Sequence, residues 1–173
     1  MSNDETQAVV AIVILLFALA AFLIPLLLFF IYVFFQTSKR KRIRQRMLSS
    51  QTEMIGQRSW APVRYASAAR FKSWFKIFPW EGAGILVMAP GSVLFLGETN
   101  SGQPVTVQFS PADSTLNWIG KTPFPNGAVS WFDFTNASGK HYFSSETGAF
   151  IFGSNRSTKE VFDQASRSFA GQA

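Results

Sequence analysis

The chain has 173 residues, which is enough for one ordinary domain with additional segments, and it contains no cysteine. The lack of cysteine excludes a disulfide framework, a thiolate metal site and a cysteine nucleophile. The formal net charge is +6, but 11 of the 16 Lys and Arg residues lie between residues 37 and 80, and the chain after residue 80 is slightly acidic. Nucleic-acid binding requires basic residues spread over a folded face, so this distribution argues against a nucleic-acid partner.

Residues 8–35 form an apolar run without a charged or amide side chain. As a helix, the run is roughly 42 Å long, against about 30 Å of hydrocarbon in a bilayer. A signal peptide would have a basic start and a shorter apolar stretch, whereas this start carries Asp4 and Glu5. The pattern therefore predicts one transmembrane helix over 8–35, preceded by a short external N-terminus over 1–7.

A basic strip follows the apolar run and predicts the orientation of the chain. Positive charge flanking a membrane helix stays on the cytoplasmic side. We therefore expect the N-terminus outside a plasma or inner cell membrane and the remainder of the chain in the cytoplasm. Residues 36–63 are predicted to be a juxtamembrane linker of mostly solvated charge, which either only sets the topology or also attracts anionic lipid headgroups. The bases of the strip are Lys39, Arg40, Lys41, Arg42, Arg44 and Arg46.

Residues 64–80 form a second basic segment, interleaved with aromatic residues. At helical spacing the aromatics share one face, and an amphipathic helix of this kind lies in a membrane interface. The alternative is that the aromatics pack on the following domain, as a leading helix or a first strand. The candidate membrane-surface residues of this segment are Arg70, Phe71, Lys72, Trp74, Phe75, Lys76 and Phe78.

The period changes after Gly82, and residues 82–170 are predicted to form a mainly β domain. Short alternating or apolar runs are separated by turn residues, which is the pattern of antiparallel strands. After Ser157 the apolar residues take helical spacing. We expect about seven short strands in a curled sheet or small barrel, closed by this C-terminal helix. The predicted strands are 83–89, 92–97, 104–109, 114–119, 128–134, 140–145 and 149–152.

This order of elements resembles the pleckstrin-homology-like superfamily, which includes GRAM and bacterial PH domains. The likeness rests on a first hairpin over 84–87 and 92–95, a late hairpin over 131–134 and 141–143, and the helix after Ser157. Members that bind phosphoinositides use bases in the first hairpin loop, but here the loop Ala89–Ser92 has none. The resemblance therefore implies a binding scaffold for a protein or peptide.

The chemistry-bearing residues do not form a recognisable catalytic or metal site. The chain has a single histidine, His141, and no cysteine, so a typical zinc site cannot be assembled. There is no nucleophile-elbow sequence and no paired carboxylates for acid–base chemistry. We expect a non-enzymatic protein without a cofactor.

The predicted function is therefore that of a membrane-anchored interaction module. Its expected partners are the bilayer, through anionic headgroups, and an unidentified protein. Phe124 and Trp131 are the candidate partner-binding residues, because an exposed aromatic patch would mark such a site. The alternative is an accessory subunit of a larger membrane complex, in which small residues of the apolar helix pack against other helices.

Overall fold

The computed structural model describes residues 3–56, 58–74, 76, 78–122, 126–127, 129–147 and 154–172. The chain divides into two compact units, Met1–Ser38 and Lys39–Ala173, which are described separately below.

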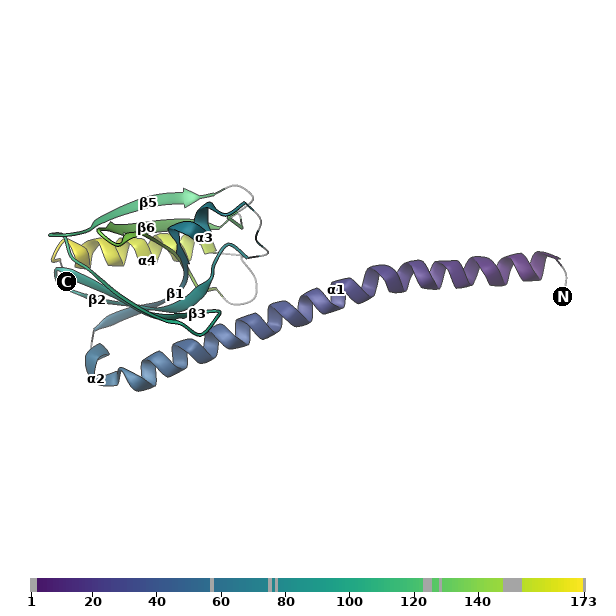
Figure 1. The fold of residues 1–173 in the computed structure, drawn as a ribbon, viewed down its shortest axis with the longest axis horizontal. Coiled ribbons are helices and arrows are strands. Elements are labelled where there is room, and N and C mark those ends of the chain that lie inside the picture. Colours follow the sequence, from purple (N-terminus) through teal and green to yellow (C-terminus); the bar gives the residue numbers. More distant parts are fainter. Residues whose placement is uncertain are drawn as a thin grey trace. The chain divides into compact units, whose positions relative to one another are not determined.

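The long helix α1, Asn3–Ser50, supplies the whole described part of the N-terminal unit and the first residues of the C-terminal unit (Figure 1). It is long and apolar enough to cross a membrane, judged by length and composition. The prediction of a transmembrane helix is supported to that extent. The prediction of a linker over 36–63 is wrong, because the helix continues to Ser50 and is followed by a short helix α2, Thr52–Ile55.

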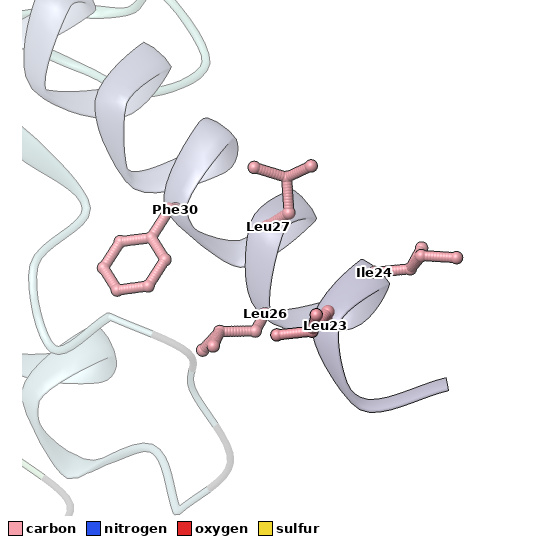
Figure 2. Close-up of a pocket in the computed structure, with 5 residues that line it drawn as sticks. All are labelled: Leu23, Ile24, Leu26, Leu27 and Phe30. Carbon is pink, nitrogen blue, oxygen red and sulfur yellow. The ribbon is translucent and has the colours of Figure 1, made fainter. Parts of the chain in front are cut away.

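Apolar side chains surround a shallow hollow on α1 beside Pro25 (Figure 2). All of them belong to this one helix, so the hollow is a feature of its surface. Lipid chains or another apolar helix could pack against such a surface without burying a polar group. The residues around the hollow are Leu23, Ile24, Leu26, Leu27 and Phe30.

A curled antiparallel sheet and a C-terminal helix make up the rest of the C-terminal unit, as predicted. Among the described residues the sheet has seven strands in the order β4-β3-β2-β1-β7-β6-β5. A short helix α3, Ala68–Lys72, follows β1, and α4, Ser154–Phe169, follows the sheet. The strands are β1 Ser59–Ser67, β2 Gly82–Ala89, β3 Ser92–Thr99, β4 Pro104–Phe109, β5 Thr115–Lys121, β6 Ser130–Asn136 and β7 Gly139–Ser145.

The strand β1 corrects the predicted boundary of the β domain at residue 82. It pairs with β2 on one side and with β7 on the other, so it joins the two halves of the sheet. Its residues Val63 and Tyr65 pack in the core, while Arg64 and Ala66 point to the opposite face. The seven described strands thus include 59–67, of which 59–63 was predicted as linker and 64–67 as the start of an amphipathic helix or, in the alternative, of a leading helix or first strand. The predicted strand 149–152 lies outside the described residues.

Two apolar layers cover the two faces of the sheet. The inner face packs against α4, which lies across the inside of the curled sheet in Figure 1, and Val161 and Ala165 of α4 meet Phe132 and Phe143 there. This helix begins at Ser154, three residues before the predicted start. On the outer face, Ile55 packs with the β2 and β3 residues Ile85, Val87 and Leu96, against which Met47 and Leu48 of α1 also lie.

Candidate functional site

Three arginines converge on one buried carboxylate in the C-terminal unit. The Nε of Arg40 donates to Glu146 at 2.7 Å, and an Nη of Arg64 donates to the other carboxylate oxygen at 3.2 Å. The guanidinium of Arg44 lies 3.3 Å from the first oxygen. The side chains of Arg40, Arg64 and Glu146 are all at most 3% exposed. We call these four residues the arginine cluster.

The indole of Trp80 forms one wall of the arginine cluster. The guanidinium carbon of Arg64 lies 4.4 Å from the ring centroid, and that of Arg40 lies 5.3 Å from it. A cation over an aromatic face is stabilised by the ring quadrupole, more so when both are removed from water. Trp80 therefore helps the carboxylate of Glu146 to stabilise the positive charges of Arg40 and Arg64.

Four separate segments build the arginine cluster and its wall. Arg40 and Arg44 come from α1, Arg64 comes from β1, Trp80 precedes β2, and Glu146 follows the last residue of β7. The backbone N–H of Glu146 also donates to the carbonyl of Pro62, which continues the ladder between β1 and β7. The cluster thus fixes residues 40–44 of α1 to the centre of the sheet.

Electrostatics keep the Glu146 carboxylate ionised. Burial alone would raise the pKa of Glu146, but the charges of Arg64, Arg40 and Arg44 outweigh it and hold that pKa below its ordinary value. Burial lowers the pKa of Arg64, and the nearby carboxylate only partly offsets this. Because a carboxylate enclosed by guanidiniums is neither a free base nor an acid near neutral pH, this arrangement suits a structural role.

The predicted solvated strip 39–46 is therefore divided between two environments. Arg40 and Arg44 are held against the domain, which the prediction of mostly solvated charge did not anticipate. The remaining bases are exposed. They are Lys39, whose Nζ donates to the carbonyl of Asn100, Lys41, Arg42 and Arg46, which pairs with Glu98.

The predicted amphipathic helix over 64–80 is wrong in its extent, because Arg64 and Tyr65 belong to β1 and α3 ends at Lys72. Two of its aromatics pack on the domain, as the alternative interpretation expected. Phe71 stacks on Tyr142 with ring centroids 3.9 Å apart, and Phe78 stacks on Trp80 at 5.3 Å. The segment thus consists of the end of β1, the short helix α3 and a loop.

Hydrogen bonds close the loop between Arg70 and Phe78. An Nη of Arg70 donates to the carbonyl of Phe78 at 2.8 Å. The Nζ of Lys76 donates to the carbonyls of Arg70 and Phe71, and also to the side chain of Asn126. Arg70 and Lys76 are thus used to shape the loop. Lys72 and Trp74 are exposed, and Phe75 lies outside the described residues.

The two candidate partner-binding residues are not brought together as a surface. Trp131 is fully buried, lies edge-on to Phe71, and donates its indole N–H to the carbonyl of Asn126 at 3.1 Å. It is a core residue, so its assignment to a partner site is wrong. Phe124 lies outside the described residues.

His141 is held by hydrogen bonds that do not present it as a base. The hydroxyl of Ser138 donates to Asn136 Oδ1 at 2.6 Å, so its oxygen accepts from Nε2–H of His141 at 3.0 Å. The other ring nitrogen then accepts from the hydroxyl of Tyr65 at 3.2 Å. Burial lowers the pKa of His141, and burial together with the charge of Glu81 raises the pKa of Tyr65 to about 12. Both shifts favour the uncharged form of the group.

Within the described part of the chain, no group of three or more His, Cys, Asp or Glu residues is placed to hold a metal ion.

Comparisons with known proteins found no family model, no curated protein and no solved structure that matches this chain. The site must therefore be interpreted from its own geometry.

Sequence reasoning missed the main features of the arginine cluster. It named Arg40 and Arg44 only as surface charge, and it did not single out Arg64, Trp80 or Glu146. The available signal was weak: an acid placed directly after a strand, more than a hundred residues from a basic helix. Its pairing depends on the order of the strands in the sheet, which no local pattern specifies.

Proposed function

We propose that this chain is a membrane-anchored, non-enzymatic interaction module. In this proposal α1 spans a plasma or inner cell membrane, and the C-terminal unit lies on the cytoplasmic side, where it binds a protein. The apolar run 8–35 and the exposed bases Lys39, Lys41 and Arg42 that follow it support the orientation.

The observation that carries this proposal is that the domain is built directly onto the helix. Ile43 of α1 is fully buried in the C-terminal unit, and Arg40 is locked into the arginine cluster. Only four residues separate Phe35, the end of the apolar run, from Arg40. A domain joined so closely to a membrane span is suited to presenting a binding surface at the membrane.

The pleckstrin-homology-like resemblance remains part of the proposal. Its support is the order of elements: a meander of β1 to β4, a meander of β5 to β7, and a C-terminal helix on the inner face of the sheet. The turn Ala89–Ser92 joins β2 to β3 and carries no base. The connection between β1 and β2 does carry bases, but Arg70 and Lys76 donate to backbone carbonyls within it. We therefore propose a protein or peptide as the ligand of this scaffold.

The orientation can be tested because the chain contains no cysteine of its own. Single-thiol variants Gln7→Cys and Gln172→Cys place a thiol at exposed positions on either side of the proposed span. In intact cells, a membrane-impermeant maleimide should label Gln7→Cys, and should label Gln172→Cys only after lysis. Labelling of Gln172→Cys in intact cells, with protection of Gln7→Cys, would show the opposite topology.

The interaction role can be tested by affinity capture from native membranes in mild detergent. The full chain is compared with a chain truncated after Ser38, which retains the N-terminal unit. A specific protein that is lost with the C-terminal unit supports the interaction module. If the same proteins remain with the truncated chain, the apolar helix carries the association, and the chain is better described as an accessory subunit of a membrane complex.

A further inference from the structure

The loop between Arg70 and Phe78 presents a tryptophan to solvent. Trp74 is 85% exposed, and among the described residues no other large apolar side chain outside α1 exceeds 41%. Hydrogen bonds from Arg70 and Lys76 close the base of this loop. An indole exposed to water lacks the stabilisation that burial would give it, so it is suited to entering the interface of a membrane.

The base of this loop is connected to the residues that follow the apolar run. Phe78 stacks on Trp80, and the indole of Trp80 lies against the guanidinium of Arg40. Arg40 is five residues beyond Phe35, and five residues reach at most about 18 Å even when fully extended. If the apolar run spans a bilayer, the chain keeps Arg40, to which the base of the loop is linked through Trp80, within that distance of the end of the run.

The charge around Trp74 suits an anionic surface. Residues 54–80 contain no acid. Lys72, two residues before Trp74, is exposed. Bases near an anionic leaflet are attracted to it, and indole rings favour the headgroup level, where one edge is apolar and the other wet.

We propose that Trp74 inserts into the headgroup layer of an anionic bilayer, with Lys72 beside it, as a second membrane contact of this chain. This inference rests on the proposed membrane anchoring and adds a lipid-contacting residue to it. The contact would limit the orientations of the C-terminal unit, because the domain would be held at the arginine cluster and again at the loop.

The test uses the full chain, with Trp74→Cys as its single thiol, labelled with an environment-sensitive fluorophore. The protein is reconstituted into phosphatidylcholine vesicles with and without phosphatidylglycerol. We expect blue-shifted emission and several-fold stronger quenching by headgroup spin-labelled lipid in the anionic vesicles. Lys72→Glu in the same background should reduce that quenching.

Trp60→Cys is the matched control, because Trp60 is also exposed but lies at the opposite end of β1 from α3. Its label should report water in both vesicles. Equal, water-like emission at positions 74 and 60 in protein that floats with the vesicles would overturn the inference and leave the anchoring intact. A label at 74 that is shielded from water but not quenched by the spin-labelled lipid would indicate a protein contact and also overturn it. Failure to float with vesicles would refute the anchoring itself.

Discussion

Replacing Glu146 with glutamine is expected to lower the free energy of unfolding of the C-terminal unit by about 3–5 kcal/mol, which is the usual cost of removing one partner from a buried ion pair. Glutamine preserves the shape and one acceptor oxygen but removes the negative charge. Arg40 and Arg64, both buried, would then repel each other and Arg44 without a compensating charge. Chemical denaturation of the full chain in detergent, followed by tryptophan fluorescence, measures the loss.

Glu98→Gln is the matched control for this prediction. Glu98 also pairs with an arginine of α1, but the side chain of Arg46 is 61% exposed. Exposed pairs of this kind contribute about 1 kcal/mol or less, so the control should unfold nearly as the unmodified chain does. Equal effects of the two substitutions would contradict the buried character of the arginine cluster.

The pH dependence of stability provides a second measurement on the same variant. The pKa of Glu146 is lowered in the folded chain, so its stabilising contribution is complete above the unfolded-state value of about 4.3 and is lost as the pH falls through the folded value. Glu146→Gln removes this titration. As the pH falls below about 5, the free energy of unfolding of the variant should therefore decrease less steeply than that of the unmodified chain. The difference in slope should correspond to the titration of one carboxyl group.

The sheet was largely predictable from the sequence because its hairpins are local. Turn residues such as Pro90 and Gly91 lie between apolar runs, and the alternation of Val105 and Val107 with polar residues marks β4. The failures lie where tertiary context overrides local pattern. The strand β1 has a proline, Pro62, and a buried Arg64, so it does not have the composition of a central strand.

The candidate site was less predictable than the fold, for an electrostatic reason. In a sequence, Arg40 and Arg42 are equivalent members of one basic strip. In the structure, Arg40 lies on the sheet side of α1 and contacts Glu146, whereas Arg42 is exposed. Helical spacing separates the two faces, but only a folded sheet with a carboxylate at its centre decides which face becomes buried. Trp74 is the opposite case, an apolar side chain that stays exposed. Its exposure depends on the hydrogen bond between Arg70 and Phe78 that closes the loop, which no local pattern predicts.

Trp131→Ala is expected to destabilise the C-terminal unit by about 3–5 kcal/mol, because truncating a fully buried indole removes apolar contacts and leaves a cavity. Trp131 packs edge-on against Phe71 and bonds through its N–H to Asn126. Denaturation of the full chain in detergent, monitored by far-ultraviolet circular dichroism, measures the effect.

Trp118→Ala is the control for Trp131→Ala, because it also truncates a tryptophan but at a partly exposed position. Trp118 lies on the edge strand β5, is 39% exposed, and contacts Phe162 and Lys159 of α4. Its truncation should cost only about 1 kcal/mol, since the indole is partly exposed and the side chain of Lys159, its cation–π partner, is half exposed. Because Trp131 is a core residue, any partner lost with Trp131→Ala should be lost in proportion to the unfolded fraction. It should return at lower temperature, where the variant is folded. Loss of a partner from a fully folded Trp131→Ala chain would contradict the core role of Trp131 and restore it as a binding residue.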